Sequence, residues 1–263
     1  MQLYAGNEAQ VRLQRIADKK SLWLRQTPGA CHSGRMVGVD DADTLGWDTI
    51  LEHLSSDGAL SFRLLAADRA EGVRRKLAAA GFRIDFWDVF AADAQTARAA
   101  CAPAADVALN DGLEFVAAEE SGDAAMLGAV QACMVRNGIA PFSGYLLGGG
   151  EGPSCLVAIR NGAGEVIATA FGYFPHGVHS GRHGEAWGGL VAVDEGHRGH
   201  GLGYLVNARM IFMLAERLGA TRVHEFASSS NLPSRRMIER CGLALDPSVV
   251  AGIATTGENR FTR

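Results

Sequence analysis

Residues 190–203 read Leu-Val-Ala-Val-Asp-Glu-Gly-His-Arg-Gly-His-Gly-Leu-Gly and carry most of the structural and functional information in this chain. An apolar run ends in a short loop with three glycines, Gly199, Gly201 and Gly203, and one arginine, Arg198. Glycine permits backbone angles and close approaches that a side chain would obstruct, and the first N–H groups of a helix have no partner inside it. The sequence therefore predicts an anion site where this loop opens a helix, with the Arg198 guanidinium adding positive charge.

The residues on either side of the loop support this interpretation. A strand is expected at 187–193, and apolar residues recur at helical spacing directly after the loop. These residues are Leu202, Val206, Met210, Met213, Leu214 and Leu218. The alternative is an ordinary tight turn, because a chain with 33 glycines in 263 residues contains several close groups of them by chance.

Two other phosphate-binding loops are disfavoured by the spacing. A Walker loop needs Gly-Lys-Ser/Thr, and none follows here. A dinucleotide fingerprint needs its third glycine three residues after the second, whereas Gly199, Gly201 and Gly203 are two apart. A nucleotide-binding enzyme that uses the loop for a different phosphate is kept as a third alternative.

Read as Arg198-x-x-Gly201-x-Gly203 after an apolar strand, the segment resembles the acyl-CoA-binding motif of the GCN5-related N-acetyltransferases, the GNAT superfamily. The resemblance implies that acetyl-CoA is the cosubstrate, that the loop holds its pyrophosphate, and that exposed backbone groups of the preceding strand bind the pantetheine arm. The implied cofactor-binding residues are Val191, Ala192, Val193, Arg198, Gly199, His200, Gly201, Leu202 and Gly203. The proline and tyrosine that the family usually has in the connecting turn are Glu195 and His197 here.

A second family-like segment is Asn231-x-x-Ser-x-x-Met-Ile238-x-x-Cys-Gly-Leu. The resemblance implies that Asn231 contacts the cofactor arm, while a simple helix cap explains the same residue equally well. Many family members have a tyrosine near the centre of this helix that protonates the departing thiolate, but the matching residue is Ile238, which cannot transfer a proton. Tyr204 and Tyr173 are possible substitutes, and direct proton transfer to the sulfur from the incoming ammonium or from a water is the alternative.

Acetyl transfer to an amine also needs a group that takes the proton of the ammonium. Glu185 is the candidate base, because alternation along a strand is expected to put it on the same face as Val191. A solvated carboxylate in the turn before the strand is the alternative. His176, His179 and His183 precede it, but their spacing matches no recognised zinc motif, and no metal is predicted. They are expected to form a polar loop at the mouth of the cleft, where one could serve as base.

Composition limits the class of protein. A hydrophobic content of 48% is ample for a buried core, and a net charge of −4 with a pI near 6.1 argues against a nonspecific nucleic-acid binder. Neither a membrane span nor a secretory signal is recognised, so a cytoplasmic protein without a membrane partner is expected. The five cysteines are scattered and are expected to be buried, reduced thiols.

The pattern of elements predicts an α/β fold with a mixed α+β sheet, and the order resembles the acyl-CoA N-acyltransferase (GNAT-like) fold. The expected strands lie at 113–117, 155–160, 166–174, 187–193 and 222–227, and the expected helices at 121–136, 202–218 and 231–241. Residues 155–160 and 166–174 should pair as a hairpin. The glycine-rich residues 141–153 are expected to be a linker, and a mobile segment over a binding cleft is the alternative. A boundary near residue 110 divides the chain into an N-terminal α/β domain, 1–110, and a cofactor-binding domain, 111–263.

The N-terminal part contains one suggestive repeat. Residues 74–82 begin with Arg-Arg and end in a glycine followed by an apolar residue, as residues 235–243 do. A degenerate second copy of the fold and chance similarity both explain so short a match. Before residue 110 there is no Arg-x-x-Gly-x-Gly loop, so a second copy is not expected to bind CoA.

These observations lead to an acetyl-CoA-dependent N-acetyltransferase in which the amine attacks the thioester directly and the N-terminal domain helps to enclose the acceptor. The acceptor amine is left open between a small molecule and a peptide, and a homodimer is left open as well. The alternative is a noncatalytic acyl-CoA-binding or regulatory module, which the replacement of the tyrosine by Ile238 permits.

Overall fold

The computed structural model describes residues 4–105, 107–110, 112–117 and 122–257. Its strands are β1 (Ala30–His32), β2 (Val37–Val39), β3 (Ala59–Ala66), β4 (Arg83–Asp93), β5 (Leu113–Phe115), β6 (Ser154–Asn161), β7 (Val166–Tyr173), β8 (Glu185–Val193), β9 (Arg222–Ala227) and β10 (Ala244–Thr255). Its α-helices are α1 (Glu8–Gln26), α2 (Ala42–Leu45), α3 (Trp47–Asp57), α4 (Ala70–Ala79), α5 (Ala94–Ala105), α6 (Ala124–Arg136), α7 (Gly144–Leu147), α8 (Leu202–Glu216) and α9 (Leu232–Arg240).

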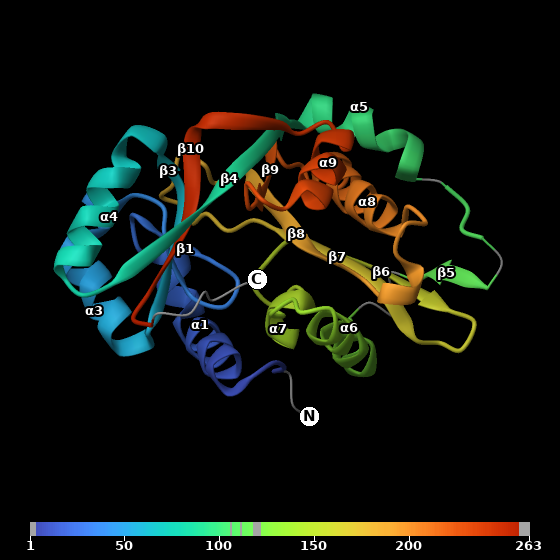
Figure 1. Cartoon of the computed structure of the whole chain (residues 1–263), viewed down its shortest axis with the longest axis horizontal. Helices are drawn as coiled ribbons and strands as arrows, with labels where there is room; N and C mark the ends of the chain where they lie inside the picture. The colour runs from blue at the N-terminus through green and yellow to red at the C-terminus, as the bar shows by residue number, and fades with distance from the viewer. Residues whose placement is uncertain (1–3, 106, 111, 118–121, 258–263) are drawn as a thin grey trace.

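A single sheet runs through the described part of the chain in the order β1-β2-β3-β10-β4-β9-β8-β7-β6-β5 (Figure 1). Neighbouring strands are antiparallel except β2 with β3 and β8 with β9, which are parallel. Both parallel pairs are joined through helices, as parallel strands require. The mixed α/β fold predicted from the sequence is confirmed.

Most of the expected elements after residue 110 lie where the sequence pattern put them. β6 and β7 form the expected antiparallel hairpin, and β9 has the expected bounds. The expected helix start at Ser121 lies outside the described residues, and α6 begins at Ala124. The expected linker at 141–153 contains a short helix, α7, because the Ser143 side chain accepts a hydrogen bond from the N–H of Leu146 and caps it.

Helices cover both faces of the C-terminal half of the sheet (Figure 1). On one face α8 packs on β6, β7 and β8, with α5 against it. On the other face α6 and α7 bury an aromatic cluster that includes Phe142, Phe171, Tyr173 and Trp187. The sheet is therefore buried on both faces here, and any ligand that reaches its middle must enter between strands.

The two halves of the chain repeat one order of elements. In each half a parallel strand pair, β2/β3 or β8/β9, is followed by a helix, α4 or α9, and then by a long strand, β4 or β10. Each helix is followed by a left-handed glycine, Gly81 or Gly242, with φ of 84° in both cases. This repeat supports the hypothesis of a second copy of the fold.

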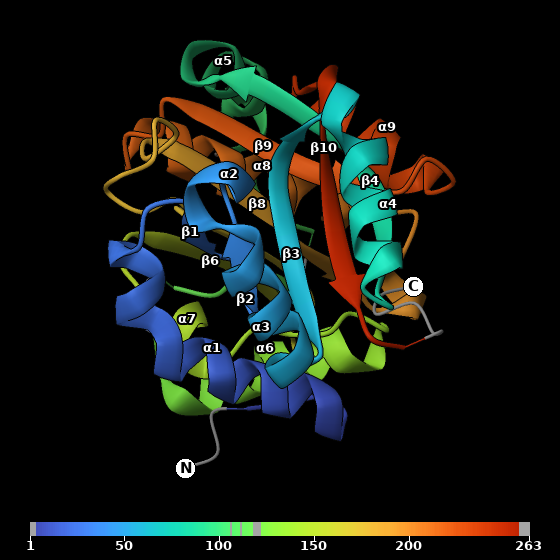
Figure 2. The same ribbon diagram turned by 90° about the vertical axis from the view of Figure 1, so that its left-hand side faces the viewer.

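The long strands of the two halves are exchanged. β10 lies between β3 and β4, and β4 lies between β10 and β9, as Figure 2 shows for the N-terminal half. The helix α5, which also precedes residue 110, packs on α8. The division into 1–110 and 111–263 stays a prediction, and a cut near residue 110 would separate elements that pack together.

Two further expectations from the sequence concern the cysteines and membrane-spanning segments. All five cysteines are buried and unpaired, as expected. In the described ranges, no helix combines the length and apolar character needed to cross a membrane.

Candidate active site

The parallel strands β8 and β9 separate along their length. They are paired from Glu185 opposite Arg222 to Trp187 opposite His224, and no pairing between them continues beyond that point in the described structure. A cavity of 230 Å³, called here the β8/β9 cavity, opens where they diverge. It is lined by residues 188–191 of β8, by Glu225 and Phe226 of β9 and by Ile238 of α9. Backbone groups of β8 on this side therefore have no neighbouring strand.

A bulge at Leu190 changes which way β8 presents its side chains. The φ of Leu190 is 52°, the register to β7 shifts at this point, and the Thr169 hydroxyl donates to the Leu190 carbonyl at 3.1 Å. An extra residue in a strand reverses the alternation beyond it. Val191 and Val193 accordingly pack on the α8 side of the sheet, while Trp187 packs on the α6 side.

The expectation that Glu185 shares a face with Val191 is therefore wrong, because the bulge lies between them. Glu185 lies at the first residue of β8, before the strands diverge. Its carboxylate is 3.4 Å from the Arg182 guanidinium and 3.9 Å from Nδ1 of His224. Its proposed role as base stays a prediction.

Two of the histidines that precede Glu185 make polar contacts within the protein. His176 places Nδ1 2.8 Å from the Asp40 carboxylate, and His183 Nδ1 lies 3.1 Å from the carbonyl of His176. Within the residues that the structure describes, no group of three or more histidine, cysteine or acidic side chains is arranged to hold a metal ion.

The glycine loop leaves the N-terminus of α8 open. Gly199 and Gly201 both have φ of 81°, a left-handed conformation that favours glycine, and no side chain caps the helix. The N–H groups of residues 199–204 donate no hydrogen bond to any group in the described part of the chain. These groups and the helix dipole favour an anion at this open helix end, and its use as a phosphate site stays a prediction.

Basic side chains surround this helix end. A cavity of 330 Å³, the loop cavity, is lined by the glycine loop and by Arg198, Arg236 and Arg240. Arg236 and Arg240 were not singled out from the sequence, although their spacing of four residues on a helix puts them on one face. Tyr204 lies in the same cavity with its ring 3.8 Å from the Arg240 guanidinium carbon. Its predicted role as acid is untested.

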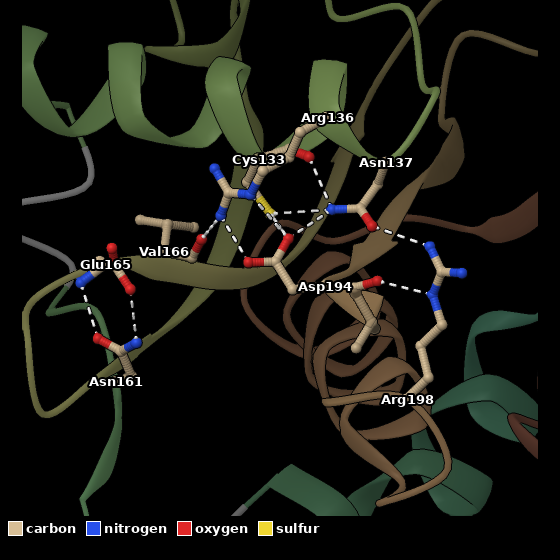
Figure 3. A network of polar contacts seen from close by, with 9 residues as sticks. Cys133, Arg136, Asn137, Asn161, Glu165, Val166, Asp194 and Arg198 are labelled. Atoms are coloured by element: carbon tan, nitrogen blue, oxygen red, sulfur yellow. Dashed lines mark hydrogen bonds and ion pairs between the residues drawn. The ribbon is translucent and has the colours of Figure 1, made fainter. Parts of the chain in front are cut away.

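A polar network fixes Arg198 at the end of β8 (Figure 3). Its Nε donates to the Val193 carbonyl at 3.0 Å and its Nη2 to the Asn137 side chain at 2.9 Å. Asn137 and Arg136 in turn donate to the Asp194 carboxylate. Burial raises the pKa of Asp194, but these hydrogen bonds outweigh it and hold the pKa below its usual value. The Asp194 carboxylate at the end of β8 is thus paired with Arg136.

Glu225 lines the candidate site and was not singled out from the sequence. It is buried on β9 and lines the β8/β9 cavity together with Ile238. Its Oε2 accepts from the Asn207 amide at 3.2 Å, and its Oε1 has no hydrogen-bond partner in the described residues. A Cβ on Gly188 would lie 3.0 Å from that Oε1, so the glycine makes room for the carboxyl. Burial raises the pKa of Glu225 to about 8, and the group is mostly protonated at neutral pH.

Asn231 acts as a helix cap in this structure. Its Oδ1 accepts a hydrogen bond from the N–H of Ser234 at 3.2 Å at the start of α9. Its contact with a cofactor arm stays a prediction.

A further cavity of 150 Å³, the α6-side cavity, is lined in part by Phe142 and Trp187 of the aromatic cluster under α6 and α7. It shares Arg35, Leu190 and Phe226 with the β8/β9 cavity. Its wall also includes Arg63 of β3 and Trp187 of β8, so it is built from both halves of the chain. The two cavities are therefore neighbours at the gap between β8 and β9.

The equivalent end of the N-terminal strand pair carries acidic groups instead. β2 is followed by Asp40 and Asp41, and Asp41 caps α2 by accepting from the N–H groups of Asp43 and Thr44. A phosphate there would meet carboxylates and an occupied helix end, and the expectation that this half binds no CoA stays a prediction.

Comparison with known proteins identifies the family. Residues 85–243 match the sequence profile of the acetyltransferase (GNAT) family. Because this span is more than half of the chain, the protein belongs to that family of acyltransferase-type enzymes. A search of the curated proteins found no match.

Solved structures show the same fold at low sequence identity. A GCN5-related N-acetyltransferase from Kribbella flavida has 18% identity and a TM-score of 0.57, over 93% of this chain and 96% of that one. A Drosophila protein has 16% identity and a TM-score of 0.58, over 98% and 92%. A tandem GNAT protein from the clavulanic acid biosynthesis pathway has 16% identity and a TM-score of 0.51, over 85% and 76%. These similarities extend over both halves of the chain.

Proposed function

We propose that this protein transfers the acetyl group of acetyl-CoA to a primary amine by direct attack on the thioester. The observation that carries the proposal is the open N-terminus of α8, which faces three guanidiniums and leads to a gap between two diverging strands. The N–H groups of residues 199–204, with Arg198, Arg236 and Arg240, suit the phosphates of CoA. The unpaired edge of β8 at Val191 suits the amide groups of the pantetheine arm, which would add to it as a strand does.

The chemistry requires two proton transfers. The amine nitrogen attacks the carbonyl carbon, the carbon–sulfur bond breaks, and the sulfur leaves as a thiolate that takes up a proton. The nitrogen loses a proton to a base, for which Glu185 or a water chain stays the hypothesis. A backbone N–H of β8 near Val193 can polarise the thioester carbonyl without any particular side chain.

We assign the proton for sulfur to Glu225. The carboxyl group is mostly protonated at neutral pH, has a free oxygen, and lines the same cavity as Ile238, where related enzymes have a tyrosine acid. Tyr204 is the alternative donor from the sequence. Tyr204 lines the loop cavity against Arg240 and is absent from the lining of the β8/β9 cavity, which favours Glu225.

The test compares Glu225→Gln, Glu185→Gln and Tyr204→Phe by the rate of thiol release from acetyl-CoA with a panel of amines. Loss of a proton donor typically costs about 100-fold or more in kcat, and this loss is expected for Glu225→Gln with an unchanged Kd for acetyl-CoA. Because the donor must be protonated, the wild-type rate constant should fall as the pH rises through about 8, and Glu225→Gln should lack that step. Wild-type activity in Glu225→Gln would refute the assignment.

Thiol release together with CoA binding separates the transferase from the two alternative functions. Ile238, buried in the cavity, is the observation that favours a noncatalytic acyl-CoA-binding module. Binding of CoA without turnover on any amine would support the module. Displacement of CoA by ATP or NAD at comparable concentration would instead support a nucleotide-binding enzyme.

A further inference from the structure

Arg63 is a buried guanidinium with an unused donor in the α6-side cavity. Its residue is 3% exposed, and it lines the cavity from β3. Nη2 donates to the Tyr173 hydroxyl at 2.9 Å and Nε to the Ser33 hydroxyl at 3.2 Å, while Nη1 has no hydrogen-bond partner in the described part of the chain. The rings of Trp187 and Phe226 lie 5.1 and 5.0 Å from its central carbon. Aromatic rings attract the cation but accept no in-plane hydrogen bond.

A second donor without an acceptor lies in the same wall. The indole Nε1 of Trp187 is buried and has no partner among the described residues. Arg35 adds a further guanidinium, which donates to the Ala140 carbonyl at 2.8 Å. Burial lowers the pKa of Arg35 to about 10, which leaves it charged at neutral pH. The cavity therefore presents positive charge and N–H donors.

Buried donors without acceptors in the cavity wall destabilise the protein unless a ligand supplies the acceptors. A buried donor without an acceptor costs roughly 1–3 kcal/mol, and more when it carries charge. Within the described residues no carboxylate forms an ion pair with Arg63. A ligand with an anionic group would bring the acceptor oxygens that Nη1 of Arg63 and Nε1 of Trp187 lack.

We propose that the α6-side cavity binds the carboxylate of the acceptor, and that the acceptor is a free amino acid or another small amine that carries a carboxylate. This inference rests on the proposed function, because it takes the cavity as the acceptor site. Leu190 and Phe226 line both cavities, so a carboxylate held in the α6-side cavity would leave the amine of a small acceptor near the β8/β9 gap, where the proposed function puts the thioester. The aromatic walls suit an apolar side chain.

The same features disfavour other amines. A polyamine or an aminoglycoside would bring positive charge against Arg35 and Arg63, which repel it. A protein lysine carries no free carboxylate near its amine, and a cavity of 150 Å³ holds a small molecule only. Of the two acceptor classes that the sequence left open, the small-molecule class fits this cavity, and an amine with a carboxylate supplies the missing acceptor oxygens.

The first experiment needs no variant. The wild-type protein is assayed for thiol release from acetyl-CoA with the twenty common L-amino acids, with the α-amide of each, and with phenethylamine and spermidine. We expect at least one amino acid to be acetylated with kcat/KM about 100-fold or more above that of its amide, since a site built to bond an anion rejects an analogue that lacks it. Turnover of the amides or of spermidine at an equal or higher rate overturns the inference while leaving the proposed function intact.

The second experiment removes the guanidinium. Arg63→Met should raise the KM for the preferred amino acid about 100-fold and leave the Kd for acetyl-CoA unchanged, and should narrow the difference between the amino acid and its amide. Arg69→Met is the matched control, because Arg69 is half-exposed and pairs with Asp43 away from this cavity. An unchanged KM in folded Arg63→Met overturns the inference.

Binding measured without turnover separates the two proposals. Calorimetry of the wild-type protein, saturated with CoA, is carried out with the twenty N-acetyl amino acids and with their amides. Binding of an N-acetyl amino acid but not of its amide, in a protein that turns over no amine, would support the carboxylate site and refute the transferase function. Binding of neither ligand, together with no turnover, would refute both. If Arg63→Met does not fold, the wild-type panels decide.

Discussion

The raised pKa of Glu225 leads to a prediction about how the free energy of unfolding depends on pH, which is independent of catalysis. In the folded protein this carboxyl holds its proton up to a pH of about 8, whereas in the unfolded chain it loses the proton near 4.5. Between these values the folded state binds a proton that the unfolded state has lost, so this group makes stability fall as the pH rises and contributes no further change above about 8. At about 1.4 kcal/mol for each pKa unit, the difference gives an upper bound of about 5 kcal/mol.

The replacement Glu225→Gln keeps the size of the side chain and removes its titration. The free energy of unfolding of the variant minus that of the wild type should grow by roughly 2–5 kcal/mol as the pH rises from 5 to 9. The reason is that the wild type loses stability over that range and the amide does not. Urea denaturation at five pH values measures this difference. Glu216→Gln on α8 is the control, since that glutamate is well exposed and pairs with Arg98. A gain that stays constant from pH 5 to pH 9 would show that Glu225 ionises normally and would refute its assignment as the acid.

Two other predictions concern the phosphate site. Arg198→Glu should raise the Kd for CoA about 10- to 100-fold, measured by titration calorimetry, because it puts a negative charge beside the open helix end. The unfolding midpoint, measured by thermal melting, should change little because Arg198 is exposed. Gly201→Val should weaken CoA binding by a similar factor, because the left-handed backbone at φ of 81° costs a valine about 1–3 kcal/mol to adopt, although no atom lies within 4 Å of the new Cβ. An unchanged Kd in either variant would contradict the phosphate site.

The glycine loop was predictable because its evidence is local. The apolar strand, Arg198, the glycines and the periodic helix follow one another in the chain, and each has a distinct residue signature. The hairpin of β6 and β7 was predictable for the same reason, since a glycine-rich turn separates two β-rich runs. The bounds of β9 and the cap at Asn231 also follow from signals within a few residues.

The catalytic assignment depended on geometry that no local pattern carries. The bulge at Leu190 reverses the faces of β8, so an alternation argument that runs through it assigns Glu185 to the wrong side. Glu225 looks like any charged residue in a strand until Asn207 and Gly188 are placed around it. The α6-side cavity joins Arg63 to Trp187, which are far apart in the sequence, and pairings of this kind are fixed by the sheet as a whole.

The exchange of β4 and β10 explains why the N-terminal half was the harder part to interpret, and it leads to a last prediction. β10 pairs with β3 on one side and β4 on the other, so it supplies the strand that closes the N-terminal half. A chain that ends at Leu243, where the family match ends, would leave β3 and β4 with unpaired edges and expose the apolar surface that Ala251 and Ala254 cover. Unpaired edges of long strands lead to aggregation rather than to a smaller fold.

We therefore expect residues 1–243 to show no cooperative thermal transition, and a chain of residues 1–257, which keeps all of β10, to unfold as the full chain does. A synthetic peptide of residues 244–257 should restore the transition when added to the truncated chain, since the gap between β3 and β4 is shaped for that strand. A truncated chain that melts cooperatively at the wild-type temperature without the peptide would show that the two halves fold independently. The exchanged strands would then join two finished domains, and the α6-side cavity, which depends on residues from both halves, would be formed by their docking rather than by a common fold.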